Sequence, residues 1–163
     1  MNKNKKKIYG WSRSDFSKSY LRKINNLDNL FETFNFAKKN SKEICLRSSG
    51  RSYGDNTLND KNLIVNYESK DKIIHFDEDK GIINVSGSTN LAELLEFTIP
   101  KGWMLHVSPA SQFISIAGCI SNNVHGKNCF IKGYFGEYIE EIDFFSYPKG
   151  LITCSKNKNE KIF

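Results

Sequence analysis

Apolar positions recur along this chain with two periods, and each period predicts a different kind of element. In residues 27–40 ("LDNLFETFNFAKKN"), apolar side chains return every three or four positions, and two lysines end the run, where the negative end of a helix would lie. Residues 90–103 repeat this pattern after Asn90 and Glu93, which have the spacing of a capping box, and a Pro-Lys-Gly sequence ends it. We therefore expect two helices.

Shorter runs rich in β-branched and aromatic residues alternate with charged turns and predict strands. The expected strands cover 43–47, 62–67, 72–76, 81–87 and 104–107, and a hairpin follows over 138–154 with its turn at Pro148–Lys149–Gly150. The runs 62–67, 72–76 and 81–87 are expected to pair as one small antiparallel sheet. Residues 108–128 are rich in small side chains and are expected to be irregular. Together these elements indicate the α+β fold class.

Size and charge narrow the range of partners. The 163 residues suit one domain, and a hydrophobic fraction of 39% with 13% aromatic residues is typical of a globular protein. The net charge is +6, and four of these charges come from Lys3, Lys5, Lys6 and Lys7. We expect residues 1–10 to be a flexible Lys-rich N-terminus and residues 11–163 to form the domain. The small charge left for the domain argues against a nucleic-acid partner. For the N-terminal lysines, the alternative to a solvated terminus is weak association with an anionic membrane surface.

The cysteines and the N-terminal sequence indicate the compartment. No CxxC spacing and no His/Cys cluster occurs among Cys45, Cys119, Cys129 and Cys154. They therefore predict free thiols in a reducing compartment and no metal site. The sequence has no apolar core of a signal peptide and no apolar run of bilayer-spanning length. These features predict a cytoplasmic location.

Residues 47–55 ("RSSGRSYGD") form the first motif with candidate chemistry. Gly50 and Gly54 permit positive φ, so that consecutive N–H groups from residues 48–53 can converge on a phosphate as an anion-binding nest. Further donors would come from the side chains of Ser48, Ser49, Ser52 and either Arg47 or Arg51. The alternative is an ordinary link between strands, in which Arg51 pairs with Asp55. The motif is neither a Walker loop nor a GxGxxG turn that opens a helix.

Residues 108–128 ("SPASQFISIAGCISNNVHGKN") form the second motif. Their small side chains would let the backbone pack closely against a flat or extended ligand, and the motif approaches its end with His125, Gly126 and Lys127. A titratable ring beside a permissive glycine and a cation is a candidate for catalysis, and a hydrogen-bonded loop histidine is the alternative. Because predicted strands flank both motifs, the two can hold opposite sides of one long cofactor.

These two motifs carry a family resemblance. The first resembles the phosphate-binding segment of the vanillyl-alcohol-oxidase-type (PCMH-type) FAD-binding domain. The second resembles the second flavin loop of the decaprenylphosphoryl-ribose oxidases and their relatives within that superfamily. The resemblance runs from about Trp11 to the end of the chain. It implies a fold of two small α/β subdomains and an FAD-dependent oxidoreductase, which moves a hydride from the hydroxyl-bearing carbon of a sugar, sugar-lipid or sugar-lactone to flavin N5.

The resemblance also implies roles for individual residues. The FAD pyrophosphate would be bound, mainly through main-chain N–H groups, by Arg47, Ser48, Ser49, Gly50, Arg51, Ser52 and Tyr53. The flavin and its ribityl and diphosphate tail would contact Pro109, Ala110, Ser111, Ser115, Ile116, Ala117, Gly118, Cys119, Ser121 and Asn122. His125 and Gly126 would lie near the isoalloxazine edge. His125 would act as the base or orient the substrate hydroxyl, and Lys127 would stabilise developing negative charge.

Several differences from the family pattern modify these expectations. Ser52 stands where some relatives attach flavin through a histidine, which implies non-covalent FAD. Ser48 and Ala117 stand where relatives often have glycine, and Asn122 stands where an aspartate is common. The relatives also have a later FAD segment and a substrate domain, so we expect a partial FAD-binding domain here. A function from another class is a nucleotide- or anion-binding module without catalysis, in which His125 is structural.

Overall fold

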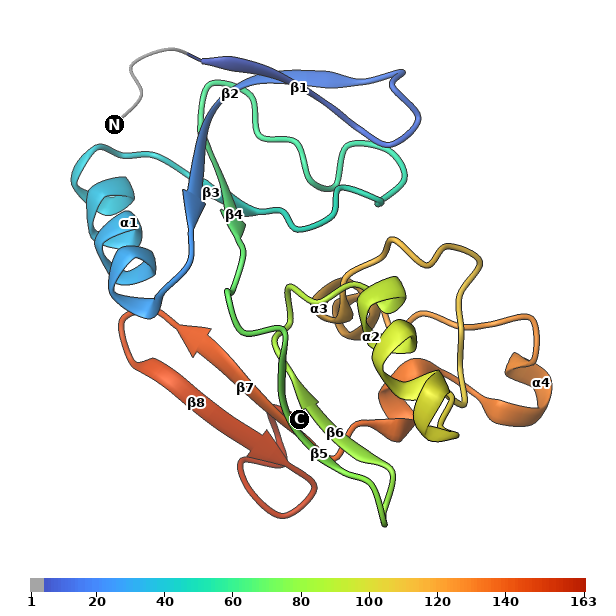
Figure 1. The fold of residues 1–163 in the computed structure, drawn as a ribbon. Helices are drawn as coiled ribbons and strands as arrows, with labels where there is room; N and C mark the ends of the chain where they lie inside the picture. Colours follow the sequence, from blue (N-terminus) through green and yellow to red (C-terminus); the bar gives the residue numbers. More distant parts are fainter. Residues whose placement is uncertain (1–4) are drawn as a thin grey trace.

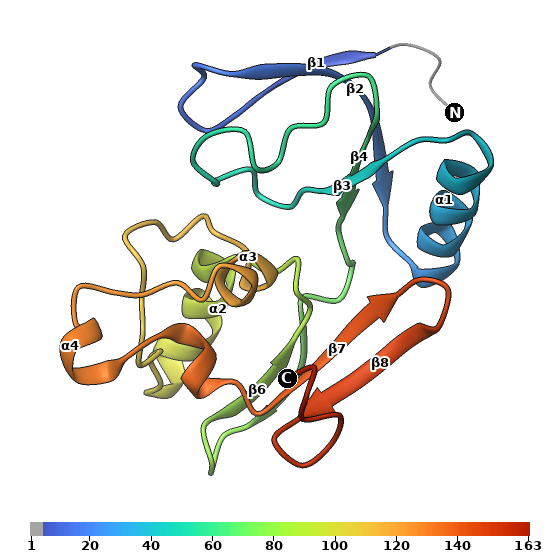
Figure 2. The ribbon, with the colours of Figure 1, turned by 180° about the vertical axis from the view of Figure 1, so that it is seen from behind.

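Two lobes lie side by side in the computed structural model, which describes residues 5–163 (Figure 1). The first lobe comprises β1 (Lys6–Tyr9), β2 (Phe16–Ile24), α1 (Leu27–Lys39), β3 (Ile44–Leu46) and β4 (Leu63–Tyr67). The second lobe comprises β5 (Ile73–Asp77), β6 (Ile82–Val85), α2 (Leu91–Thr98), η1 (Ile99–Lys101), α3 (Ile116–Ser121), α4 (Cys129–Lys132) and η2 (Phe135–Tyr138). The chain then returns toward the first lobe as a hairpin of β7 (Glu141–Ser146) and β8 (Gly150–Ser155), as both views show (Figure 2).

The sheet of the first lobe has the strand order β1-β2-β4-β3. Strand β4 lies between β2 and β3 and runs parallel to both. Its residues Leu63, Ile64 and Val65 are all buried, as a central strand that is covered on both faces requires. The prediction that 62–67 belongs to an antiparallel sheet was therefore wrong, whereas β5 and β6 do pair antiparallel.

The N-terminal lysines are only partly as expected. Lys6–Tyr9 pairs antiparallel with the start of β2, so β1 is an edge strand and not a flexible tail. Main-chain pairing needs no apolar side chains, and the Lys-rich sequence therefore concealed it. The turn after β1 also packs closely, since a Cβ added at Gly10 would lie 2.6 Å from the Gly54 carbonyl oxygen. The remainder of the predicted tail, residues 1–4, lies outside the described residues.

Helix α1 confirms the prediction for residues 27–40. Asn26 precedes the helix, and its side-chain oxygen accepts a hydrogen bond from the N–H of Asn29, which satisfies one free donor of the first turn. Lys38 and Lys39 lie in the last turn, where the helix dipole favours positive charge. On its inner side the helix packs Leu30 against the sheet, in a core shared with β2 and β4.

The hairpin β7–β8 confirms the prediction for 138–154 and packs against α1 (Figure 1). Phe145 joins the core around Leu30. The ring of Tyr147 stacks on Phe34 with 5.3 Å between the ring centroids, and its hydroxyl hydrogen-bonds Asn35 Oδ1 at 2.8 Å. The last elements of the chain therefore complete the first lobe.

Helix α2 has the predicted capping box. Asn90 Oδ1 accepts a hydrogen bond from the N–H of Glu93, and the Glu93 carboxylate accepts one from the N–H of Asn90. The core of the second lobe is formed by Leu91, Leu94, Val107, Ile116, Cys119 and Phe135. No helix within residues 5–163 has both the length and the apolar character that crossing a bilayer requires.

Two predictions for the second lobe were wrong. Residues 104–107 are not a strand, because no neighbouring strand pairs with them, although Val107 is buried in the core. Residues 108–128 are not irregular throughout, because α3 forms within them. Its start is fixed by Ser115, whose hydroxyl accepts a hydrogen bond from the N–H of Gly118, and Ile116 and Cys119 place apolar groups on the core side.

The buried thiol of Cys119 makes the stability of the second lobe depend on pH. Burial raises the pKa of this thiol from an ordinary 9.0 to about 11. A group with a raised pKa stabilises the fold while it is protonated, so its contribution is complete below the ordinary value and is lost as pH rises toward the folded value. We expect the Cys119 contribution to the free energy of unfolding to fall by about 1.4 kcal/mol between about pH 8 and about pH 10.

Urea denaturation of the wild type and of Cys119→Ala at both pH values measures this contribution. The wild type should lose more stability than the variant over this interval, by the amount stated above. Burial also raises the pKa of Cys45, which acts in the same direction and is present in both proteins. Equal losses in the two proteins would contradict the prediction.

Candidate functional site

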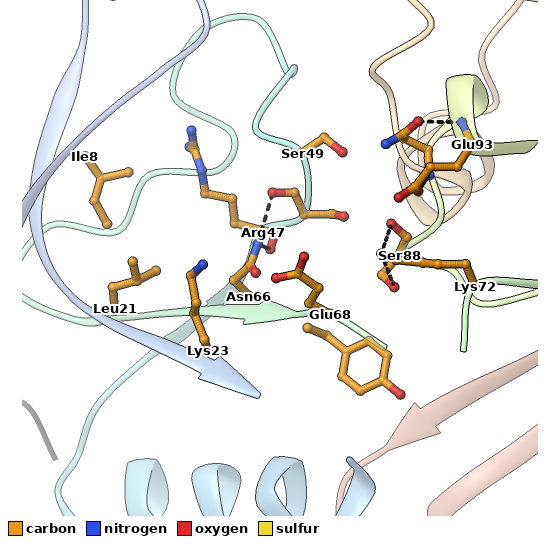
Figure 3. Close-up of a pocket in the computed structure, with 13 residues that line it drawn as sticks. Ile8, Leu21, Lys23, Arg47, Ser49, Asn66, Glu68, Lys72, Ser88 and Glu93 are labelled. Atoms are coloured by element: carbon orange, nitrogen blue, oxygen red, sulfur yellow. Dashed lines mark hydrogen bonds between the residues drawn. The ribbon is translucent and has the colours of Figure 1, made fainter. Parts of the chain in front are cut away.

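A cavity of about 350 Å³ lies between the two lobes (Figure 3). The first lobe lines it with residues of β1, β2 and β4 and with the start of the loop that follows β3. The facing wall includes Ser88, Asn90 and Glu93 of the second lobe. Cations and carboxylates both occur in the lining, since Lys23 and Glu68 are also part of it. The cavity can therefore hold a polar ligand that contacts both lobes.

The first motif brings a row of free donors to this cavity. Arg47, Ser48 and Ser49 line it, and the motif continues outward through residues 50–53. Within the described part of the chain, no hydrogen bond is made by any main-chain N–H of residues 48–53 or by the hydroxyls of Ser48, Ser49 and Ser52. Meanwhile Asn66 Nδ2 donates to the carbonyl oxygens of Arg47 and Ser48, at 2.9 and 3.1 Å. Six consecutive N–H groups are thus available to an anion.

Arg47 supports this bend from inside. Its Nη1 donates to Thr57 Oγ1 at 2.8 Å and its Nη2 to the carbonyl oxygen of Tyr9 at 2.9 Å. Gly50 has a φ of 64° and lies directly on the guanidinium, where a Cβ would overlap Arg47. The guanidinium is therefore engaged with the protein. Of the two arginines that the sequence suggested as donors to a phosphate, Arg51 is therefore the one that could make this contact.

Arg51 joins the first motif to the second. Its guanidinium carbon lies 4.3 Å from the ring centroid of Trp11 and 5.3 Å from that of Phe113. The buried Nε has no hydrogen-bond partner among residues 5–163. Arg51 forms no ion pair with Asp55, so the ordinary-link alternative lacks its expected contact. An unpartnered donor therefore lies where the two lobes meet.

The second motif lies behind the wall of the cavity that belongs to the second lobe. Ile116 N–H donates to the Thr89 carbonyl and Ala117 N–H to the Gly87 carbonyl, both at 2.8 Å. Segment 114–117 is thereby held against residues 87–91, whose Ser88 and Asn90 line the cavity. Arg51 of the first motif also contacts Phe113 of the second. The two motifs are therefore in contact through Arg51 and Phe113, although no residue of the second motif lines the cavity.

Individual residues of the second motif differ in exposure. Ser115, Ile116 and Cys119 are buried in the second lobe, so these three residues offer almost no surface to a ligand. Pro109, Ser111 and Gly118 are half-buried, and the exposed members are Ala110, Ala117, Ser121 and Asn122. Neither Ser48 nor Ala117 has a positive φ, so both positions accept a Cβ where relatives often have glycine.

His125, Gly126 and Lys127 do not line the cavity. His125 and Lys127 are exposed, and His125 Nδ1 lies 3.4 Å from the Gly126 carbonyl oxygen. The rings of His125 and Tyr134 are nearly perpendicular, with 6.0 Å between the ring centroids. Gly126 is buried, and a Cβ there would lie 2.8 Å from the Ser108 carbonyl oxygen. The glycine therefore allows the chain to turn close to Ser108 and present the histidine to solvent.

Several cavity residues did not stand out in the sequence. Lys23 and Asn66 lie opposite each other on β2 and β4, and only the parallel register brings them to the cavity. Ser88 belongs to the run of small residues "SGST" after β6, and this run is the sequence feature that could have indicated a ligand contact there. The loop after a strand is a common place for ligand contacts.

The donors and cations of the cleft fit the diphosphate of FAD. Free main-chain N–H groups stabilise phosphate oxygens without a bulky side chain, and Lys23 and Arg51 add positive charge nearby. The positive φ of Gly50 shapes the bend that presents these donors. A ligand without hydrogen-bond acceptors would fit these residues poorly, because the unpaired donors would lose their hydration and gain no hydrogen bond in exchange.

Curated relatives are similar to this chain. The decaprenylphosphoryl-beta-D-ribose oxidase of Mycolicibacterium smegmatis is 26% identical over 110 residues, which cover 68% of this chain and 24% of that protein. The FAD-linked oxidoreductase janO of Penicillium janthinellum is 25% identical over 157 residues, which cover 96% of this chain and 34% of that protein. The chain thus spans about a quarter to a third of the length of these relatives.

Solved structures share the fold. The 6-hydroxy-D-nicotine oxidase of Arthrobacter nicotinovorans superposes with a TM-score of 0.82 at 16% identity, over 95% of this chain and 34% of that one. The BBE-like 1 protein of Physcomitrella patens gives a TM-score of 0.80 at 19% identity, over the same shares. The family described as "FAD binding domain" matches residues 19–155. The chain therefore belongs to this PCMH-type family of FAD-binding oxidoreductase domains, and its cofactor is FAD.

Proposed function

We propose that this chain holds the cofactor of an FAD-linked oxidoreductase that oxidises a hydroxyl group of a sugar, a sugar-lipid or a sugar-lactone. The observation that carries the proposal is the row of six unpartnered N–H groups at residues 48–53, which begins at the cavity between the lobes with Ser48 and Ser49. The similarity to a decaprenylphosphoryl-beta-D-ribose oxidase supports a substrate of the sugar class.

The residues of the chain would share the work as follows. The first motif would bind the diphosphate, and the exposed part of the second would lie along the flavin. With Nδ1 protonated toward the Gly126 carbonyl, His125 Nε2 is free to accept the proton of the substrate hydroxyl. Lys127 would stabilise the negative charge that develops on that oxygen. When bound, FAD supplies the acceptor for the hydride that leaves the substrate carbon bearing this hydroxyl group.

Attachment of FAD would be non-covalent. Some relatives attach flavin through the imidazole of a histidine. The matched position here is Ser52, whose hydroxyl is a much weaker nucleophile than an imidazole. Acid precipitation of the FAD-loaded chain should therefore release the flavin into the supernatant. Yellow colour that stays with the precipitate would contradict this proposal.

Flavin spectroscopy tests the proposed function. The full chain is loaded with FAD, freed of excess cofactor by gel filtration and mixed without oxygen with alditols, sugar lactones or a polyprenylphosphoryl sugar. We expect flavin absorbance to remain with the protein and to bleach with at least one of these substrates. Retained flavin without bleaching by any of them would favour the non-catalytic nucleotide-binding alternative.

A further inference from the structure

The outer face of the β1–β2 hairpin gathers lysines and aromatic rings that the cofactor site does not use. Antiparallel pairing places Tyr9 opposite Phe16 and Lys7 opposite Lys18, so these four side chains lie on one face. Ile8, between Lys7 and Tyr9, points the other way and lines the cavity. We call the side turned away from the cavity the basic–aromatic face. It also includes Lys5, Tyr20 and Lys42.

Ammonium groups cover the rings of this face. Lys7 Nζ lies 4.0 Å from the ring centroid of Phe16 and 5.0 Å from that of Tyr9. Lys5 and Lys42 lie 5.6 and 5.8 Å from the ring centroid of Tyr20. Each of these rings therefore has an ammonium group close to it at the surface. Tyr9 and Phe16 remain 41% and 49% exposed.

The charge on this face is unbalanced. Within residues 5–163, none of its lysines forms an ion pair with a carboxylate. Asp60 is nearby, but its Oδ1 accepts the main-chain N–H of Lys18. Two lysines directly opposite each other on paired strands repel, so Lys7 and Lys18 cost stability in the isolated protein. Protection of an edge strand would explain lysines there, but it would not explain exposed aromatic rings beside them.

We propose that the basic–aromatic face docks the protein on a membrane surface that contains anionic phospholipids. Lysines near such a surface attract the headgroups, and half-exposed Tyr and Phe rings favour the interfacial region. A single-stranded nucleic acid would need free ring faces on which bases stack, and here lysines occupy those faces. The charge complementarity therefore favours lipid headgroups.

Co-sedimentation of the full chain with lipid vesicles tests this proposal. Vesicles of phosphatidylcholine alone serve as the neutral reference, and vesicles that also contain phosphatidylglycerol are the anionic probe. We expect binding only to the anionic vesicles, and we expect it to weaken as salt is added. Each lysine near the surface contributes about fivefold to the partition constant, so Lys7→Gln with Lys18→Gln should lower binding about 25-fold.

A matched variant removes the same charge elsewhere. Lys156→Gln with Lys158→Gln alters two exposed lysines in the turn after β8, and it should leave vesicle binding within about twofold of wild type if the face is specific. Circular dichroism of both double variants confirms that they are folded. Equal losses in the two double variants would overturn the proposal. So would absence of vesicle binding together with salt-sensitive binding of a single-stranded oligonucleotide to the same face.

Discussion

Replacement of His125 by Ala is expected to slow the reduction of bound flavin by substrate about 10²- to 10⁴-fold. The imidazole is the proposed acceptor of the hydroxyl proton, and without it the hydride would have to leave a carbon whose oxygen is still protonated. FAD affinity should stay within about twofold, since His125 does not line the cavity at the diphosphate end. Anaerobic stopped-flow absorbance measures the reduction rate, and a flavin titration measures the affinity.

A second histidine provides the control for this experiment. His75 lies exposed on β5, outside the cleft lining, and His75→Ala should reduce flavin at the wild-type rate. If His125→Ala also reduces flavin at the wild-type rate, His125 is not the base. The residue would then be the structural loop histidine of the alternative interpretation.

Replacement of Gly50 by Ala is expected to weaken FAD binding about 100-fold. The left-handed φ of 64° costs an L-residue about 1 to 2 kcal/mol, and the new Cβ would also overlap the Arg47 guanidinium. Displacing Arg47 would break its hydrogen bonds to Thr57 and Tyr9, each worth about 1.5 kcal/mol or more. The bend would then relax away from the conformation that presents its N–H groups. A fluorescence titration with FAD measures the dissociation constant.

Gly54 allows strain and overlap to be separated. It has nearly the same φ, 66°, in the same loop, but a Cβ there would have no atom within 4 Å. Gly54→Ala should therefore weaken FAD binding by about tenfold at most, from backbone strain alone. Equal effects of the two substitutions would show that Arg47 does not support the bend. Unchanged affinity in both would mean that the bend does not bind the diphosphate.

The elements that the sequence predicted best are those whose order is local. Helix α1 and the capping box of α2 depend on neighbours three or four positions apart, and both formed as expected. The pairing of β4 could not be obtained in this way, because its buried run of Leu63, Ile64 and Val65 has no period that distinguishes a parallel central strand from an antiparallel one. Nor does the sequence of Lys6–Tyr9 reveal an edge strand that is held by main-chain bonds.

The candidate site was predictable to the extent that it consists of one continuous segment. The bend was predicted from the glycines and serines of residues 47–53, and the N–H groups of residues 48–53 are free, as an anion-binding nest requires. Lys23 and Asn66 come from separate strands and meet only through sheet register. The sequence also suggested Arg47 as a ligand contact, but tertiary hydrogen bonds to Thr57 and Tyr9 engage its guanidinium.

The return of β7–β8 to α1 makes the second lobe an insertion within the first. The Tyr147–Asn35 hydrogen bond joins positions 112 apart in the sequence, and such distant contacts are costly to close during folding. A fragment that stopped after β4 would leave Phe31 and Phe34 of α1 without the aromatic rings that cover them. The two halves of the cleft are therefore separate in space but inseparable along the chain, and no single cut yields either of them intact.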